Sequence, residues 1–407
     1  KTVFGRKRRA RYPRVGIMSV GPLSGLRIID LSMFVAGPFA TATLGELGAE
    51  IIKVEPPGGD PVRRNGVGPE ISGKSAQFHT YNHGKRSIEL DLKSDEGRNT
   101  VLQLVGSSNV IFDNFRPGVM ARLGLCHAEL IATNPKLVGV SLSGFGSTGP
   151  WSKRAGYDLI VQALSGGLSL CGHPKTGPAH IPYHLGDTAG GLYAAIAILA
   201  AVREAETTGI GRAYEVSMLD AQLHLCSDEI TASGTGEWPS NPHGAGHPAL
   251  APYAVFQTAD DPIVIAAVGT EKFWLNLLDV LELPELASDI RFSNNRVRAQ
   301  NVAALTVKLE AQLASRSAAD WLTLFTKADV PSAPVLSVVD AVRSEHATAR
   351  NLIPRISAGF GGTAQVPRIP IRLLGELCVA DLKPAPDLDA DSAFVQDLSV
   401  NLGAFDE

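Results

Sequence analysis

The chain has 407 residues, of which 44% are hydrophobic and 19% are charged, and its formal net charge at pH 7 is −4. This length exceeds what one ordinary core supports, so we expect about two domains. The profile is typical of a globular protein, and its mixed charges give no indication of binding to nucleic acid or a membrane. We also find no apolar run of the ~20 residues that a membrane-spanning helix needs.

The first residues are unusually basic. Residues 1–17 contain seven basic side chains and no acidic one, and Met18 follows them. Three interpretations are open: a mitochondrial-type presequence, a basic arm, or a translated leader ahead of a start at Met18. We favour the last and set residues 1–22 apart as a leader that is disordered or non-native. The protein is then expected in the cytoplasm, or in the mitochondrial matrix if the leader is a true presequence.

From Leu26 onward, short apolar runs alternate with helical stretches. The runs rich in β-branched residues predict buried strands over Leu26–Leu31, Ile51–Glu55, Val110–Asn114 and Leu137–Leu142. The stretches between them predict helices over Phe39–Leu47, Glu96–Val105, Val119–Leu123 and Glu129–Thr133. This alternation predicts an α/β fold with a parallel sheet and helices on both faces. We expect residues 23–205 to form the first part of this large domain.

The second half changes character. A long helix is predicted from Asp187 to about Glu206, then a strand at Arg212–Ser217, a helix at Leu219–Ile230 and a Gly- and Pro-rich loop at Ser233–Pro252. A smaller α+β domain is predicted from strands Tyr253–Thr258 and Ile263–Val268 and helices Glu271–Leu281, Val302–Ala314 and Ala318–Ala328. We therefore expect a linker at 206–224, the small domain at 225–335, and a linker with a return to the large domain at 336–407.

Two glycine motifs lack the context that their usual functions need. Gly68-x4-Gly73-Lys74-Ser75 matches the phosphate-loop pattern, but no buried strand precedes it, so a nucleotide-binding ATPase is only a remote alternative. Gly144–Gly149 matches the dinucleotide fingerprint, but Pro150 stands where a helix should begin. We expect the second set of glycines to let the backbone approach a ligand or another chain.

The cysteines are few and scattered. None of Cys126, Cys171, Cys226 and Cys378 belongs to a CxxC pair. This pattern favours a reducing compartment and predicts neither a disulfide nor a metal site.

Asp187 is the strongest candidate for a reactive residue. It lies where the polar run His184–Gly186 changes into a long, nearly uncharged helix. As an N-cap, its oxygen would accept a backbone N–H, and the helix dipole would keep the carboxylate ionised. A carboxylate with an ordinary pKa near 4 is an anion at neutral pH and attacks an activated acyl group without a separate base. A purely structural N-cap is the competing interpretation.

Three blocks favour the reactive interpretation. They are Leu31–Pro38 with Leu47–Glu55; Asn82–Lys93 with Asp113–Gly118; and Gly144–Pro150 with Arg154–Asp158, followed by the Asp187 helix. In this order and spacing the chain resembles the family III coenzyme A transferases, the CaiB/BaiF group that includes formyl-CoA transferase and carnitine CoA-transferase. The resemblance runs from about Leu23 to at least Gly362.

The resemblance implies a reaction in two halves. The aspartate that matches Asp187 attacks the donor acyl-CoA, and the released thiolate converts the mixed anhydride into an aspartyl-CoA thioester. A free carboxylic acid then takes the CoA through a second anhydride. Only a carboxylate nucleophile gives an adduct labile enough to return CoA. Acyl-CoA is then a substrate, and no tightly bound cofactor is implied.

The resemblance also implies where CoA binds. Its contacts should fall on Val35, Ala36, Leu90, Asp91, Leu92, Lys93, Asn114, Phe115, Arg116, Arg122 and Arg154. Independently of the family, CoA phosphates require cations, and Lys85 and Arg86 lie in the same short segment as Lys93. A solvated basic face is the alternative explanation for this cluster.

Several positions depart from formyl-CoA transferase. Val35 replaces a side-chain amide near the thioester, so oxyanion stabilisation must come from the backbone there. Pro56 replaces an arginine that holds CoA, which leaves Arg63, Arg64 or Lys74 as substitutes. The segment His243–Pro248 has fewer glycines than that enzyme's mobile loop, which argues against formate and oxalate as the substrate pair. Arg63, Arg64, His243 and His247 are candidates to bind a second carboxylate, as in transferases that act on dicarboxylates.

An isomerase is the alternative function within the same superfamily. In α-methylacyl-CoA racemase the base that moves the α-proton is a histidine, at the position where this chain has Tyr157. A tyrosine with an ordinary pKa near 10 is a poor base at neutral pH, so Tyr157 favours transfer over racemisation or epimerisation.

The family fold implies a particular architecture. It combines a Rossmann-like large domain built from both ends of the chain with the smaller α+β domain, in an interlocked, ring-like homodimer. Gly166, Gly167, Gly190 and Gly191 would permit the close backbone passage that interlocking requires.

Overall fold

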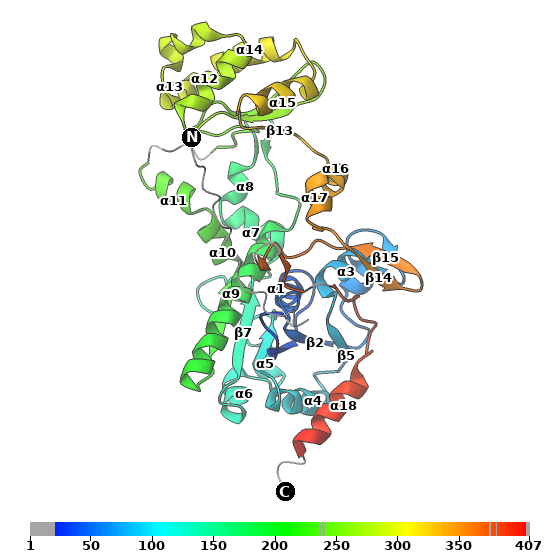
Figure 1. Cartoon of the computed structure of the whole chain (residues 1–407). Helices are drawn as coiled ribbons and strands as arrows, with labels where there is room; N and C mark the ends of the chain where they lie inside the picture. The colour runs from blue at the N-terminus through cyan, green and yellow to red at the C-terminus, as the bar shows by residue number, and fades with distance from the viewer. Residues whose placement is uncertain (1–20, 237, 239–240, 374–375, 380, 404–407) are drawn as a thin grey trace, which may run out of the picture. The chain divides into compact units, whose positions relative to one another are not determined.

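The computed structural model describes residues 21–236, 238, 241–373, 376–379 and 381–403 (Figure 1). Residues 1–20 of the predicted leader lie outside the described residues, so the predictions about the leader and about cellular location stay predictions. The chain divides into two compact units. The larger contains 1–157, 186–221 and 352–407, and the smaller contains 158–185 and 222–351.

The larger unit is built on a six-stranded sheet whose neighbouring strands are all parallel, as predicted. The strand order is β10-β7-β6-β1-β2-β5. The strands are β1 (Arg27–Asp30), β2 (Glu50–Glu55), β5 (Arg86–Glu89), β6 (Val110–Asp113), β7 (Val138–Ser143) and β10 (Ala213–Ser217). Because β1 is followed by β2 on one side and lies beside β6 on the other, the winding direction reverses between β1 and β6. Ligands of such doubly wound sheets bind at the carboxyl ends of the strands at this switch point.

Helices cover the sheet because its strands are apolar on both sides. They are α1 (Ala36–Gly45), α4 (Asp95–Gly106), α5 (Val119–Arg122), α6 (His127–Thr133), α9 (Leu185–Thr208), α10 (Met218–Leu225) and α18 (Ser392–Gly403). Ile29 and Ile111 pack in one core cluster with Val101 of α4 and Val395 of α18. The C-terminal helix therefore returns to the N-terminal sheet, as Figure 1 also shows. Ser94 caps α4 by accepting a hydrogen bond from the backbone N–H of Gly97.

Short elements complete the larger unit beside the sheet. They are α2 (Val62–Asn65), β3 (Glu70–Ile71), β4 (Lys74–Ser75), α3 (Ala76–Asn82), β14 (Arg355–Gly359), β15 (Gly362–Gln365), β16 (Arg372–Leu373) and β17 (Glu376–Leu377). A small cluster of Ile356, Ala358, Ala364 and Val366 packs against Ile71. This contact ties the C-terminal hairpin β14–β15 to the segment after β2.

The smaller unit is α+β, as predicted. It contains the three-stranded antiparallel sheet β11 (Tyr253–Phe256), β12 (Ile263–Ala266) and β13 (Ser332–Pro334) and the two-stranded β8 (Gly172–His173) and β9 (Gly177–Pro178). Its helices are α7 (Asp158–Leu164), α8 (Gly167–Leu170), α11 (Ser227–Ser233), α12 (Glu271–Val280), η1 (Pro284–Ala287), η2 (Ile290–Phe292), α13 (Asn295–Gln300), α14 (Val302–Leu313), α15 (Ala318–Lys327), α16 (Val338–Arg343) and α17 (Glu345–Ala349). Trp274, Phe292, Trp321 and Phe325 fill its core.

The boundaries of the units differ from the predicted domains. Residues 158–185, predicted to lie in the large domain, belong to the smaller unit. The predicted linker at 206–224 contains β10, which pairs with β7 and forms an edge of the large sheet. The predicted helix over Leu219–Ile230 is two helices, α10 and α11, with Cys226 between them. These differences arise because strand pairing at long range assigns a segment to a unit, and neither apolar periodicity nor turn residues report that pairing.

Helix α9 corrects the expectation about apolar runs. Its 24 residues are long and apolar enough to cross a membrane by length and composition, with a mean hydropathy of 1.6 in the most apolar window. A share of 44% of that window is buried within the structure. Core helices of soluble proteins share these properties, and here the helix begins with the turn that contains Asp187.

Candidate active site at the switch point

The loops that follow β1 and β6 are joined by one side chain. The Asn114 amide nitrogen donates to the Met33 carbonyl oxygen over 2.7 Å, and its amide oxygen accepts from the Met33 N–H over 2.9 Å. Just before it, the Asp113 carboxylate accepts from the Phe115 N–H over 3.0 Å. Asn114 therefore lies at the predicted ligand crevice, where it holds the two loops together; that it also contacts CoA stays a prediction.

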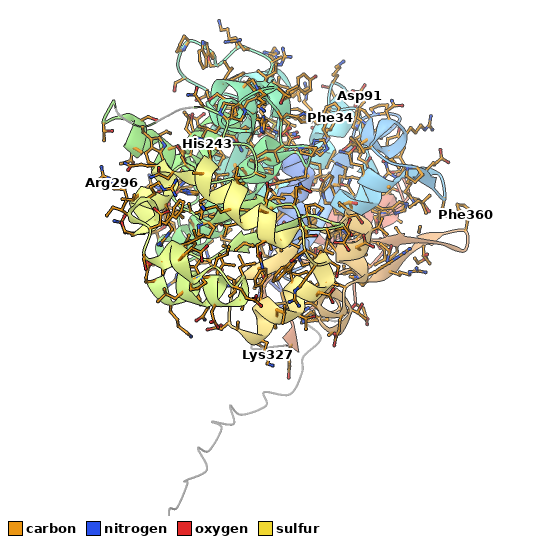
Figure 2. All side chains as sticks on the ribbon, turned by 90° about the horizontal axis from the view of Figure 1, so that it is seen from above. Phe34, Asp91, His243, Arg296, Lys327 and Phe360 are labelled. Carbon is orange, nitrogen blue, oxygen red and sulfur yellow. The ribbon has the colours of Figure 1, made fainter. Side chains whose placement is uncertain are left out.

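The loop after β1 contains backbone N–H groups that lie at the crevice. Phe34, which is labelled in Figure 2, is half exposed (46%) and has a positive φ of 67°. Val35 precedes α1 without a side-chain cap. The N–H groups at the start of a helix have no partner within the helix and attract negative charge. A Cβ on Gly37 would lie 2.3 Å from the Ser32 Cβ, so only glycine allows this tight approach. The backbone at Val35, where oxyanion stabilisation is expected, thus lies in a tight turn at the start of α1, and its role in stabilising an oxyanion stays a prediction.

Asp187 lies in the first turn of α9, which begins two residues earlier at Leu185. It is therefore not the N-cap that the sequence predicted, although a carboxylate in the first turn still benefits from the helix dipole. One turn further on, a Cβ on Gly191 would lie only 2.6 Å from the Ala36 carbonyl oxygen and 2.8 Å from the Phe39 ring. The structure thus brings Asp187 within about one helical turn of the start of α1, where Val35 and Ala36 lie.

The Gly191 contact gives a direct test of this arrangement. Gly191→Ala forces the start of α1 away from α9, because backbone atoms cannot yield as a flexible side chain can. We expect the free energy of unfolding to fall by about 1–3 kcal/mol, with an accompanying loss of activity. Gly45→Ala is the matched control: it lies in α1, its Cβ would meet only Ile51 at 3.4 Å, and alanine favours helix. Equal stability of the two variants in urea unfolding would contradict the close contact.

The predicted CoA contacts line the same edge of the sheet. Leu90–Lys93 follow β5 and Asn114–Arg116 follow β6, with β1 and β2 between them. Three strand spacings correspond to roughly 15 Å, a span that an extended ligand can bridge. Lys93, Arg116, Arg122 and Arg154 are all exposed. Arg154 lies over the Trp151 ring at 5.2 Å, and Arg116 lines a cavity of about 440 Å³ at the ends of β6, β7 and β10.

Four other basic residues are not available for phosphate. The ammonium of Lys85 is buried and donates to Asp30 and Asn82, and Arg86 pairs with Glu50 and Asp391. The predicted role of Lys85 and Arg86 in a CoA-binding cluster is therefore wrong. Arg63, Arg64 and Lys74 are the candidates to replace the arginine that is absent at Pro56. Arg63 pairs with Glu55, and Lys74 pairs with Asp387. Arg64 is the exposed member of that set.

Both glycine motifs have structural roles. Lys74 and Ser75 form β4 of a short hairpin, and the Ser75 hydroxyl caps the seven-residue α3, so this segment is not a phosphate loop. In the second motif, a Cβ on Gly144 would lie 2.7 Å from the Gly156 Cα. This glycine therefore allows two backbone segments of the same chain to approach closely, and the expected approach to a ligand or to another chain stays a prediction.

A buried ionic network supports the loop after β1, and sequence reasoning assigned it no role. The fully buried Lys53 ammonium donates to the Ser32 carbonyl oxygen over 2.8 Å and to Asp60 over 3.0 Å. Asp60 in turn accepts from the Phe34 N–H over 3.4 Å. The available signal was a lysine in the middle of the apolar strand Glu50–Glu55, because a buried charge requires a partner. Lys53 and Asp60 thus position the loop without belonging to the reacting groups.

Asp30, at the end of β1, makes stability depend on pH. Burial raises its pKa, but Lys85, Lys53 and the hydroxyls of Ser32 and Thr41 outweigh that effect and lower the pKa from 3.8 to about 2. Because the folded state favours the ionised form, its contribution is complete above pH 4 and is lost as the pH falls through 2. The loss is on the order of 2 kcal/mol.

Urea unfolding between pH 5 and pH 2 checks this dependence. In Asp30→Asn the free energy of unfolding should decrease less between pH 5 and pH 2 than in the wild-type protein. Asp220 is exposed in the same unit, and Asp220→Asn should show the same decrease as the wild-type protein. An unchanged slope in Asp30→Asn would show that other groups are responsible.

Comparison with known proteins identifies the family. The family model for CoA-transferase family III matches residues 23–392. The chain is 39% identical over 376 residues to the acetyl-CoA:oxalate CoA-transferase of Acetobacter aceti, covering 92% of this chain and 94% of that protein. It is 32% identical over 375 residues to the succinyl-CoA:glutarate CoA-transferase of Mus musculus, covering 92% and 85%.

A solved relative has the same fold. The crystal structure of a CaiB/BaiF family protein from Brucella suis superimposes with a TM-score of 0.81 at 34% sequence identity, covering 93% of this chain and 100% of that one. Since the family model and the relatives match nearly the whole chain, this protein belongs to CoA-transferase family III and is a coenzyme A transferase.

Proposed function

We propose that this enzyme moves CoA between two carboxylic acids through covalent intermediates on Asp187. The observation that carries the proposal is the position of Asp187 in the first turn of α9, one turn from the close contact between Gly191 and Ala36. A carboxylate nucleophile and the backbone donors at the start of α1 then lie together at the switch point.

The proposed steps conserve atoms and charge. The Asp187 carboxylate attacks the donor thioester carbon, which forms a mixed anhydride and releases CoA as a thiolate. The thiolate attacks the Asp187 carbonyl carbon, which releases the donor acid and leaves an aspartyl-CoA thioester. The acceptor carboxylate attacks this thioester, which forms a second mixed anhydride and releases the CoA thiolate. The thiolate then attacks the acceptor carbonyl carbon of that anhydride, which gives the product acyl-CoA and restores the Asp187 carboxylate. Each tetrahedral step develops an oxyanion, which preorganised N–H groups stabilise.

We further propose that the acceptor is a dicarboxylate. The support comes from the names of relatives, which act on oxalate and on succinate with glutarate. The expectation against oxalate has no support from these relatives, so oxalate is again a candidate. A panel of acyl-CoA donors crossed with oxalate, succinate, glutarate, malate, itaconate and carnitine tests the proposal. Exchange confined to monocarboxylates would contradict it.

The isomerase alternative is not favoured, because the relatives are named as CoA-transferases, and one experiment separates the two activities. Tyr157 is 65% exposed at the end of a segment of the larger unit, where the racemase has its histidine base. A transferase should exchange CoA between acids without incorporating solvent deuterium at the acyl α-carbon. Deuterium incorporation without CoA exchange would identify the racemase.

We also propose that the enzyme is an interlocked homodimer. Leu192 and Ile196, one turn apart on α9, are 48% and 58% exposed within one chain, which is unfavourable unless another surface covers them. Gly190 and Gly191 do not supply the close passage between subunits that the sequence suggested, because they pack against residues of their own unit. Light scattering should give the mass of two chains, and a monomeric mass would contradict the proposal.

A further inference from the structure

The segment that leads into α9 contains a strained residue. We call residues 181–185 the entry turn, which ends at Leu185, the first residue of α9. Within the entry turn, His184 has a positive φ of 50°. A residue other than glycine stays in this left-handed conformation only where the surrounding structure holds it, and such strain is concentrated at functional sites. The structure around the entry turn must therefore supply contacts that hold it.

Gln162 of α7 holds the beginning of the entry turn. Its amide oxygen accepts from the Ile181 N–H over 3.0 Å, and its amide nitrogen donates to the Ile181 carbonyl oxygen over 3.1 Å. The same nitrogen donates to the Asp158 carboxylate over 2.8 Å, which fixes the orientation of the amide. One side chain thus pairs with both polar backbone groups of Ile181.

Gln222 of α10 holds the end of the entry turn. Its amide nitrogen donates to the carbonyl oxygen of Leu185 over 3.1 Å. Gln162 and Gln222 are each only 2% exposed, so water does not compete for these hydrogen bonds. Both glutamines and the entry turn belong to the smaller unit. Side chains from two helices therefore fix the turn at both ends.

The position of the entry turn affects the chemistry of Asp187. Asp187 follows Leu185 by two residues in the same helix, so a shift of the Leu185 backbone moves the carboxylate with it. Attack on a thioester requires the reacting atoms to be aligned about 3–3.5 Å apart, and an error of ~1 Å costs about 100-fold in rate. An amide carries no charge, so each glutamine holds the turn without adding a charge near the nucleophile.

We propose that Gln162 and Gln222 are positioning residues for CoA transfer, which hold the entry turn so that Asp187 meets the thioester in the geometry of attack. The inference rests on the proposed function, in which Asp187 is the nucleophile, and deepens it by naming residues that act through Asp187. Neither glutamine makes or breaks a bond in the proposed steps. Their loss should therefore lower the rate of attack and leave the binding of the donor unchanged.

The test compares Gln222→Met with Asn276→Leu. Each change keeps the approximate size of the side chain and removes its amide. Asn276 is a partly buried residue of α12 in the smaller unit, and its amide nitrogen also donates to a backbone carbonyl, that of Ala328, over 2.7 Å. Asn276→Leu therefore removes the same kind of hydrogen bond at a position outside the entry turn.

Three measurements on the full chain separate rate, binding and stability. Hydroxylamine trapping at a series of donor acyl-CoA concentrations gives the saturating rate at which Asp187 is labelled. The same series gives the donor concentration at half that rate. Urea unfolding gives the effect of each substitution on stability, and steady-state exchange gives kcat.

We expect Gln222→Met to lower the saturating labelling rate and kcat by about 10- to 100-fold, because Asp187 is no longer held in line with the thioester. The donor concentration at half the labelling rate should stay within about threefold of the wild-type value. Asn276→Leu should lower the urea midpoint by a similar amount but keep the wild-type rate. If Gln222→Met does not fold, Gln162→Met decides by the same criteria.

Two results would overturn the inference. One is a labelling rate for Gln222→Met within about fivefold of that for Asn276→Leu, which is what a purely structural glutamine predicts. The other is a rise in the half-saturating donor concentration at an unchanged rate, which would assign Gln222 to donor binding.

The failure of this inference differs from the failure of the proposed function. If wild-type Asp187 is labelled and the glutamine variants are labelled at the rate of Asn276→Leu, only the positioning is wrong and the covalent mechanism stands. If the wild-type protein exchanges CoA with no label on Asp187, the covalent mechanism is wrong and the inference falls with it.

Discussion

Asp187→Ala is expected to lower kcat/KM for CoA exchange by a factor on the order of 10⁴ or more, since loss of a nucleophile that forms the covalent intermediate removes the whole pathway. Asp187→Asn, which keeps the size of the side chain, should be equally inactive, because an amide does not attack a thioester to form an anhydride. Neither change should alter the free energy of unfolding by more than about 1 kcal/mol, the value of a charge near a helix N-terminus.

Asp220→Asn provides the control. Asp220 also lies in the first turn of a helix, α10, in the part of α10 that belongs to the larger unit. Asp220→Asn should change the free energy of unfolding about as much as Asp187→Asn does, but it should leave CoA exchange unchanged. A purely structural Asp187 would make the two variants indistinguishable in activity.

Among single substitutions in the buried ionic network that supports the loop after β1, we expect Lys53→Met to lower the free energy of unfolding most. Both side chains of the Lys53–Asp60 pair are fully buried. Burial would lower the pKa of Lys53, but Asp60, Asp30 and Glu55 outweigh it and raise the pKa, so the ammonium is charged. Removing it leaves the Asp60 carboxylate buried without its counter-charge, which costs about 3–5 kcal/mol. Exchange should also fall, because the Ser32 carbonyl and Asp60 lose the group that holds them.

Lys272→Met is the matched control for that experiment. The Lys272–Asp329 pair has a similar distance of 2.8 Å, but its side chains are 66% and 70% exposed. Solvent screens such a pair, so its loss should cost less than about 1 kcal/mol. Urea unfolding of both variants measures the loss in free energy of unfolding. Equal losses would show that the Lys53–Asp60 pair contributes no more than an exposed ion pair. If Lys53→Met does not fold, the isosteric Asp60→Asn tests the same network.

The parallel sheet of the larger unit could be predicted because most of its strands are buried and therefore consist mainly of apolar residues. Ile28, Ile51, Ile111 and Val140 are all buried, and each belongs to a short apolar run that alternates with a helix. Strand β5 was missed because Arg86–Glu89, at the edge of the sheet, contains a single apolar residue, Ile88. An edge strand has one pairing partner only, and its composition resembles that of a loop.

The site was predicted unevenly for a similar reason. Asp187 was identifiable because the change from polar to apolar residues marks a helix start, although the start itself lies two residues earlier. The burial and pairing of Lys85 could not be predicted, because its partner Asp30 lies 55 residues away and both are buried only once the strands pair.

The central claim is that one carboxylate carries first the acyl group and then CoA. Incubation with an acyl-CoA donor, followed by hydroxylamine and peptide mass spectrometry, tests it most directly. The account predicts a hydroxamate on the peptide that contains Asp187, formed only after donor is added and absent in Asp187→Ala. Efficient CoA exchange with no modification of Asp187, or with the hydroxamate on a different carboxylate, would contradict it.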